Sequence, residues 1–255
     1  MPMLARPFVA KPAPRRARPA APPVALVGKN AEMRINGTLV AALPEGALWI
    51  EAARTLVVSD LHLEKGSSFA RGGQMLPPYD TRACLRKLVA LIEALAPDRV
   101  VSLGDSFHDV GGPMRMDASD RAVLEALTAR CDWVWILGNH DPEIPSALGG
   151  TMLRELRIES LLLRHEPYEG DAPGEIAGHL HPCARVLGRG RSVRRRCFAA
   201  DGHRTVMPAF GAYTGGLNLC DNAFSKIFPN GALALMLARD RVLPAAYARL
   251  SPDGG

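Results

Sequence analysis

The sequence has no long hydrophobic run and no paired-cysteine motif. No window approaches the roughly 18 consecutive apolar residues that a membrane-spanning helix needs, and the most apolar short run, residues 232–238, has the length of a strand. The five cysteines form no C-x-x-C pair and are odd in number, so neither a zinc knuckle nor a disulfide framework is indicated. We therefore predict a protein without a membrane span, located in the reducing cytoplasm.

Several catalytic designs are also missing. There is no G-x-S-x-G elbow, no H-E-x-x-H helix and no G-x-x-x-x-G-K-[ST] loop, which argues against a serine hydrolase, a zincin and a P-loop enzyme. Aromatic residues make up only 5% of the chain, so the stacking platforms of single-strand-binding proteins are not evident. Extended base readout is therefore not expected.

Acidic residues are absent from the first 30 positions, which contain six basic residues and are rich in proline and alanine. Because such a composition cannot bury a core, we predict a disordered basic extension over residues 1–30, with organelle targeting or nucleic-acid contact as alternatives. The whole chain carries a formal charge of +5, whereas residues 31–255 alone carry −1. The folded part is therefore not globally basic.

Strand-like and helix-like segments alternate through the first half of the chain. Residues 55–59, 99–103 and 133–137 form apolar runs of strand length, and residues 80–95 and 118–130 have helical apolar spacing. Each of the three strands leads directly into a polar motif. An α/β plan of this kind places functional groups at the carboxyl ends of neighbouring strands.

The second half contains short strands separated by glycine and proline. We predict a mostly antiparallel arrangement there, in which two sheets pack face to face with helices outside and form a single domain over residues 31–250. The expected strands are residues 161–164, 174–178, 184–187, 193–198, 205–209, 232–238 and 241–246.

Five short motifs contain five of the seven histidines. Neutral imidazole and carboxylate oxygen are ligands of Mn, Fe and Zn, and a hydrolytic centre with two metals needs several such donors at one place. The motifs, in chain order, are Asp60-Leu61-His62, Gly104-Asp105, Gly138-Asn139-His140-Asp141, His165 and Gly178-His179-Leu180-His181.

This ordered set resembles the signature of the calcineurin-like metallophosphoesterase superfamily, which runs D-x-H, G-D, G-N-H-[DE], H and G-H-x-H. The resemblance implies a four-layer αββα sandwich, with two mixed β-sheets packed face to face between flanking helices. It also implies two divalent metal ions, with Mn as the first choice and Fe or Zn as alternatives. Asp105 would bridge the two ions. The implied metal ligands are Asp60, His62, Asp105, Asn139, His165, His179 and His181.

The same resemblance implies the catalytic roles. A metal-bound hydroxide would attack phosphorus without a covalent enzyme intermediate, so the chain would be a metal-dependent phosphoric ester hydrolase. His140 would protonate the leaving oxygen or stabilise the transition state, and Asp141 would orient His140.

Further motifs narrow the resemblance. Residues 60–66, 104–109, 138–141, 165–167, 178–182 and 208–216 are similar to the PdeM-type branch, named as ligase-associated DNA-damage-response endonucleases. That resemblance implies a phosphodiesterase acting on DNA in DNA repair, in functional association with a DNA ligase and a helicase. Two alternatives stay open. One is a phosphomonoesterase or a diesterase of small nucleotides, such as cyclic nucleotides or nucleotide-sugar pyrophosphates, and the other is a non-catalytic metal-binding scaffold.

Polar residues outside the metal motifs are candidates for substrate contact. A run of arginines follows the last metal motif and would contact phosphates if it lined the groove, although a solvated hairpin face explains the pattern equally well. The histidine and aspartate after the Gly104-Asp105 motif would line the cleft or support a metal ligand. The candidates are His108, Asp109, Arg189, Arg191, Arg194, Arg195 and Arg196.

Overall fold

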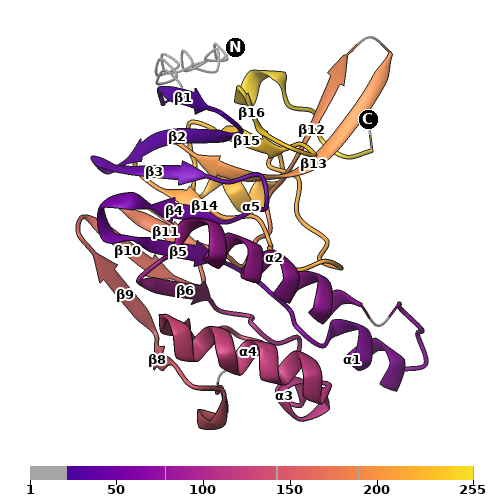
Figure 1. Cartoon of the computed structure of the whole chain (residues 1–255). Helices are drawn as coiled ribbons and strands as arrows, with labels where there is room; N and C mark the ends of the chain where they lie inside the picture. The colour runs from indigo at the N-terminus through magenta and orange to yellow at the C-terminus, as the bar shows by residue number, and fades with distance from the viewer. Residues whose placement is uncertain (1–21, 78, 142, 189, 255) are drawn as a thin grey trace, which may run out of the picture.

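Two mixed β-sheets pack face to face in the computed structural model of the chain, which describes residues 22–77, 79–141, 143–188 and 190–254 (Figure 1). The sandwich predicted from the sequence is therefore confirmed. Most of the predicted basic extension, residues 1–21, lies outside the described residues. Within the described part, no helix is both long and apolar enough to cross a membrane.

The first sheet has eight strands in sequential order from β1 to β8. Its first five strands form an antiparallel meander, whereas β5 to β8 run parallel to one another. The strands are β1 (Val24–Val27), β2 (Asn30–Ile35), β3 (Thr38–Ala42), β4 (Leu48–Ile50), β5 (Thr55–Val58), β6 (Arg99–Leu103), β7 (Asp132–Ile136) and β8 (Thr151–Leu153).

The helices of the parallel half cover the outer face of this sheet (Figure 1). The two long ones, α2 (Asp80–Leu95) and α4 (Ala118–Arg130), have the bounds that the sequence predicts. Leu88 of α2 is fully buried against Leu56 and Val58 of β5 in one apolar cluster. The shorter helices, which the sequence analysis did not predict, are α1 (Lys65–Arg71) and α3 (Gly112–Arg115), with 3-10 turns η1 (Glu51–Ala53) and η2 (Ser146–Leu148).

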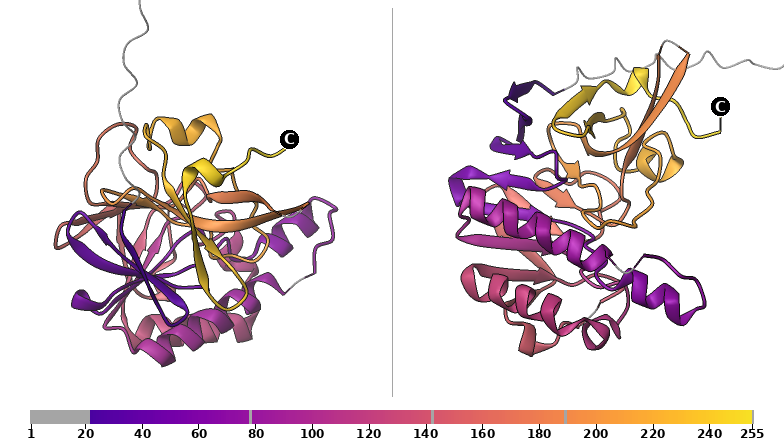
Figure 2. Two further views of the ribbon diagram at one scale, coloured as in Figure 1. Left: turned by 90° about the horizontal axis from the view of Figure 1, so that it is seen from above. Right: turned by 45° about the vertical axis from the view of Figure 1, so that its right-hand side comes forward.

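The second sheet has the strand order β16-β15-β13-β14-β11-β10-β9, with β12 paired to β13 beside this path. Most of its pairs are antiparallel, as predicted, but β10–β11 and β11–β14 are parallel. The outer halves of β12 and β13 project from the body as a hairpin (Figure 2). The strands are β9 (Glu155–Ile158), β10 (Leu161–Arg164), β11 (Glu175–Ala177), β12 (Cys183–Gly188), β13 (Arg191–Ala200), β14 (Thr205–Val206), β15 (Leu233–Leu237) and β16 (Val242–Ala245).

Alternation along the strands divides the core into layers. Val57 and Val101 point between the sheets and pack in one cluster with Phe198 of the second sheet. The outer face of the second sheet is covered by less helix than expected, because its only described helical cover is α5 (Asn222–Ser225) and the 3-10 turn η3 (Tyr247–Arg249). Phe224 of α5, together with the segment that follows it, closes this face.

The first strand begins inside the region predicted as disordered. Val24–Val27 pairs antiparallel with β2, and Gly28 makes the connecting turn with a φ of 60°. The β-branched ends of this short run favour a strand, and the pairing with β2 supplies its backbone hydrogen bonds. The predicted boundary at residue 31 is therefore too late.

Candidate metal centre

The polar motifs lie where the central strands end. Several of their residues have a left-handed backbone conformation, which L-amino acids rarely adopt. Positive φ angles occur at ten non-glycine residues of the described chain, and five of these are predicted ligands. Each such residue costs about 1–3 kcal/mol and persists only where its surroundings fix it. The residues and angles are Asp60 (52°), His62 (44°), Asp105 (47°), His179 (67°) and His181 (45°).

Backbone hydrogen bonds hold these turns against each other. The Asp60 N–H donates to Gly104 O at 3.2 Å, and the His62 N–H donates to Asp105 O at 2.9 Å. The turn after β5 therefore rests on the turn after β6. These hydrogen bonds offset the strain of the turns.

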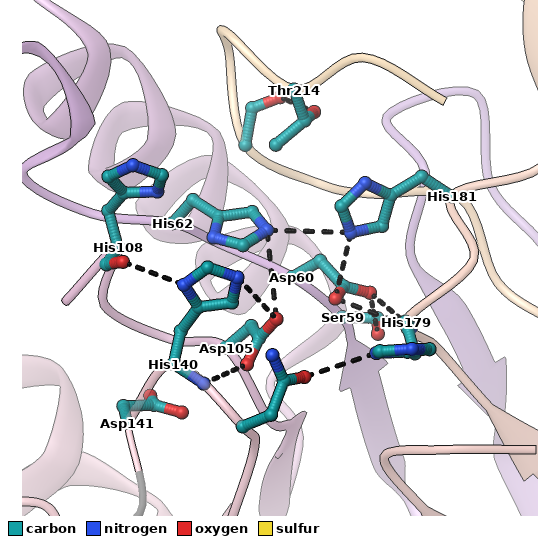
Figure 3. Close-up of polar contacts among 12 residues, drawn as sticks. Ser59, Asp60, His62, Asp105, His108, His140, Asp141, His179, His181 and Thr214 are labelled. Carbon is teal, nitrogen blue, oxygen red and sulfur yellow. Dashed lines mark hydrogen bonds and ion pairs between the residues drawn. The ribbon is translucent and has the colours of Figure 1, made fainter. Parts of the chain in front are cut away.

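One group of donors joins the end of β5 to the loop that precedes β12 (Figure 3). Asp60 Oδ1 lies 3.0 Å from His181 Nε2, and His62 Nε2 lies 3.4 Å from the same nitrogen. The ligand atoms of Asp60, His62 and His181 all fall within 4.8 Å of one another. Two imidazoles and a carboxylate at this spacing fit a divalent transition metal.

A second group lies beside the first. Asp105, His165 and His179 also have their ligand atoms within 4.8 Å of one another. Asn139 joins them, because its Oδ1 is 3.0 Å from His165 Nε2 and 3.1 Å from His179 Nδ1. All seven predicted ligands are thus brought together.

The Asp105 carboxylate faces both groups. Its Oδ1 lies 3.4 Å from His165 Nε2, and its Oδ2 lies 4.0 Å from His62 Nε2. Each oxygen is therefore directed to a different group of donors. This is the geometry that a carboxylate shared by two ions requires.

Neighbouring groups orient the donors. Ser59 Oγ donates to Asp60 Oδ2 at 2.5 Å, and the His179 N–H donates to the same oxygen at 3.1 Å. His165 Nδ1 donates to Leu103 O at 2.7 Å, which leaves Nε2 to face the metal site. Ser59 is not among the site residues predicted from the sequence, although its position directly before the first motif aspartate is a signal that indicates it.

Two glycines of the motifs are required because other side chains lie too close to them to leave room for a Cβ atom. A Cβ atom on Gly138 would overlap the Asp105 carboxylate, and one on Gly178 would overlap the side chains of Ser59 and Asp60. Any other residue would therefore push a metal-binding carboxylate out of place.

The electrostatics of the centre favour the neutral form of His62 and the charged form of Asp105. Burial lowers the pKa of His62 to about 3, so its imidazole is neutral. Burial alone would raise the pKa of Asp105, but the hydrogen bond and charge of His165 outweigh it and hold that pKa well below its usual range. For His165, burial lowers the pKa, yet the hydrogen bond to Asp105 and the charges of Asp60 and Asp105 raise it to about 9. The centre therefore attracts positive charge strongly.

His140 lies at the open side of the centre. Its side chain is 41% exposed, whereas that of Asp105 is only 4% exposed. The ring nitrogen Nδ1 lies 3.0 Å from His108 O, and Nε2 points toward Asp105 Oδ2 at 3.9 Å (Figure 3). His140 is thus the imidazole that an incoming substrate can reach.

The contact expected between Asp141 and His140 is not made. Asp141 Oδ2 accepts from the N–H groups of Ser106 and Phe107, at 2.6 and 3.0 Å. Consecutive side chains leave the chain in different directions, so Asp141 is buried under the turn that carries Asp105 while His140 faces solvent. Burial raises the pKa of Asp141 to about 6. Its contacts fix the Asp105 turn, and the His108 carbonyl orients His140 instead.

The two candidates after Asp105 differ in their contacts. The His108 ring stacks on the His140 ring, with centroids 5.5 Å apart and an angle of 18°. Both oxygens of Asp109 bind Arg115, at 2.8 and 2.7 Å, and Oδ1 also accepts from the Gly111 N–H. His108 therefore lies beside the exposed His140 ring, whereas Asp109 orders the loop through Arg115 and Gly111.

The predicted arginine strip is divided by its contacts. Arg194 pairs with Asp253 at 3.0 Å, and Arg196 Nη1 donates to the carbonyls of Ala209 and Gly211 at 2.7 and 2.9 Å. These two side chains therefore bind the protein itself. The other described members, Arg191 and Arg195, are exposed on the hairpin, and Arg189 lies outside the described residues.

The chain is similar to one protein family and to two solved structures. The family model of the calcineurin-like phosphoesterases matches residues 53–205. The solved structure of Pseudomonas putida nuclease MPE is 25% identical, has a TM-score of 0.65, and covers 85% of this chain and 100% of its own. Yfce, a phosphoesterase from E. coli, is 15% identical with a TM-score of 0.37 and covers 76% of this chain and 98% of its own. No curated protein matches the sequence.

Proposed function

We propose, from the premise that this chain belongs to the calcineurin-like phosphoesterase family, that it is a metal-dependent phosphodiesterase that cleaves nucleic acid. One observation carries the hydrolytic part of the proposal. Asp105 turns one oxygen to each of two donor groups, and the exposed His140 ring lies 3.9 Å from that carboxylate. The similarity to a nuclease supports the choice of nucleic acid as substrate.

Each part of the centre has a defined task in such a reaction. A pair of ions held by the seven ligands would supply Lewis-acid stabilisation of the phosphate oxygens and a nucleophile at neutral pH. Asn139 is an uncharged ligand, so it leaves the positive charge of the centre available to a phosphate. The exposed ring of His140 would donate a proton to the leaving oxygen.

The remaining details of the proposal rest on chemistry and on the motif resemblance. We propose Mn as the working metal because the donors combine imidazoles, carboxylates and an amide oxygen, with Fe and Zn as the competitors to exclude. The five cysteines are all free, which supports a cytoplasmic location. A role in the DNA damage response beside a DNA ligase and a helicase is supported by the motif resemblance alone.

A metal-reconstitution assay tests the proposal. Protein stripped with EDTA is loaded separately with Mn, Fe, Zn or Mg and assayed on single-stranded, duplex and nicked DNA, on bis-p-nitrophenyl phosphate and on p-nitrophenyl phosphate. We expect Mn-dependent cleavage of DNA and of the diester. Preference for the monoester, or cleavage of small diesters without DNA cleavage, would contradict the proposal.

A matched variant tests the role of His140. We expect His140→Ala to lower turnover of the diester by about 10²–10⁴-fold because a positioned proton donor is lost. Metal content, measured by elemental analysis, should stay at the wild-type value. Loss of metal together with activity would show that His140 is a ligand and not a proton donor.

A further inference from the structure

A basic cavity of about 480 Å³ lies beside the metal centre, separated from it by the segment 209–211. It opens between the β3–β4 loop, α2, the outward end of β13 and the β15–β16 turn. Five of its ten lining residues are cationic and two are acidic. The cavity is therefore suited to an anion.

Two of the cations are largely buried and bind only neutral groups. Lys87 Nζ donates to Phe210 O at 2.5 Å and lies 3.8 Å from the centroid of the Phe210 ring. Arg196 is bound to the carbonyls of Ala209 and Gly211. Within the described residues, no carboxylate lies within 4.0 Å of either cation. Burial lowers the pKa of Lys87 to about 8 and also lowers the pKa of Arg196. Buried charges without a counterion are costly, so this wall favours an incoming anion.

The acidic groups of the wall are already paired. Glu45 Oε1 lies 3.2 Å from Lys29 Nζ, and Asp240 Oδ2 lies 3.1 Å from Arg241. Neither carboxylate reaches Lys87 or Arg196. Glu45 therefore offsets the charge of Lys29, while the five lining cations still outnumber the two lining carboxylates.

Exposed arginines continue the basic surface outward. Arg195 and Arg239 line the mouth of the cavity and are exposed. Arg191 lies four residues before Arg195 on β13, so both side chains lie on one face of that strand. Arg191, Arg195 and Arg239 thus form a basic surface that extends from the hairpin to the cavity.

The segment 209–211 connects the cavity to the metal centre. Its N–H groups donate to the carbonyls of Ser59 and Asp60, at 2.8 Å from Phe210 and 3.1 Å from Gly211. Its carbonyls accept from Lys87 and Arg196 on the other side. A single backbone layer thus separates the two sites.

We propose that this cavity binds a phosphate group of the substrate strand, away from the bond that is cut, and that Arg195 and Arg191 contact the phosphates that follow. The identity of the strand rests on the proposed function. Phosphate contacts of this kind position a nucleic acid without reading its sequence. The low aromatic content of the chain is consistent with such a mode of binding.

Binding without metal tests the cavity separately from catalysis. Fluorescence anisotropy of a labelled single-stranded oligonucleotide is measured in EDTA for the wild type, for Arg195→Gln/Arg239→Gln, and for the control Arg154→Gln, which changes an exposed arginine on the β8–β9 connection. We expect about tenfold weaker binding for the double variant and wild-type binding for the control. The slope of log affinity against log salt should become shallower by about 0.7 for each lost contact. Equal affinities for the double variant and the control would overturn the inference.

Titration with inorganic phosphate distinguishes a site for free phosphate from a site for a phosphate group of a nucleic-acid strand. Titration calorimetry with inorganic phosphate alone is carried out on the wild type and the double variant. Phosphate binding that the variant loses, while oligonucleotide affinity stays unchanged, would mean that the cavity holds free phosphate and would contradict the inference. Oligonucleotide binding that the variant loses supports it. If the wild type binds the oligonucleotide through this cavity but never cleaves it, the proposed function fails and the cavity assignment stands.

Discussion

Asp105 and Asp141 are two buried carboxylates close together in the same site, and their surroundings give them different tasks. The Asp105 carboxylate lies beside the His165 imidazole and accepts a hydrogen bond from the His140 backbone N–H, and both contacts favour its charged form. Asp141 receives two backbone N–H groups, but burial dominates and raises its pKa to about 6. The first is therefore suited to bind cations and the second to hold backbone in place.

Removing the Asp141 carboxylate should destabilise the protein. In Asp141→Ala the N–H groups of Ser106 and Phe107 lose their acceptor in a buried place, so we expect the free energy of unfolding to fall by about 2–4 kcal/mol in urea titrations. Asp141→Asn keeps an acceptor oxygen and should recover most of that loss. Equal stability of Asp141→Ala and the wild type would show that these contacts contribute nothing.

Lys87 should make stability depend on pH above neutrality. Its pKa falls from 10.5 to about 8 on folding because of burial, and the side chain is faced by Arg196, Cys84 and Glu45. Between these two pH values the unfolded chain binds a proton that the folded chain does not, so the free energy of unfolding should rise with pH in this window. Lys87→Met should remove that rise. Urea titrations from pH 7.5 to 10 measure the difference, and parallel curves would contradict the prediction.

Some helices and strands can be predicted from their own residues, whereas others depend on contacts with distant parts of the chain. The helix Ala118–Arg130 and the strand Arg99–Leu103 could be predicted to the residue, because apolar spacing and flanking turns act locally. The strand Val24–Val27 could not, since three of its four residues are exposed and only the pairing with β2 holds it. The same reason applies to the metal centre. Motif order indicated which side chains would meet, whereas the direction of Asp141 depends on a turn formed 35 residues earlier in the chain.

The short helix α5 covers its sheet through few side chains. Phe224 is 2% exposed and lies against Ala199 and Ala234 of the second sheet. We expect Phe224→Ala to lower the free energy of unfolding by about 3–5 kcal/mol. Val123→Ala on α4, where the side chain is 38% exposed, is the control and should cost well under half of that. Similar losses for both variants, measured by urea titration, would show that α5 is not a structural cover.

The whole molecule is joined at the metal centre as well as by the core between its sheets. Asp60, Asp105 and Asn139 follow strands of the first sheet, whereas His165, His179 and His181 follow strands of the second. Ions bound by both sets would therefore connect the sheets directly.

Removing the ions should lower the thermal stability. A ligand that binds the folded state alone stabilises it by about 2.7 kcal/mol when its free concentration is a hundred times its Kd. We expect EDTA treatment to lower Tm by several degrees and Mn to restore it. His203→Ala, a change at an exposed turn residue, should respond to EDTA and Mn as the wild type does. A Tm that does not depend on the metal would contradict a connection between the sheets.

The positive φ angles of the ligand turns have a kinetic consequence. These turns are fixed by hydrogen bonds to Gly104 O, Asp105 O and the neighbouring carboxylates, so the chain itself sets the positions of the donors. We expect incorporation of an ion to require loss of its bound water and of the proton on His165, with little rearrangement of the backbone. Uptake should therefore be rapid, and the cation found in the protein should reflect the free concentration of each metal in the compartment together with the affinity of the site for it.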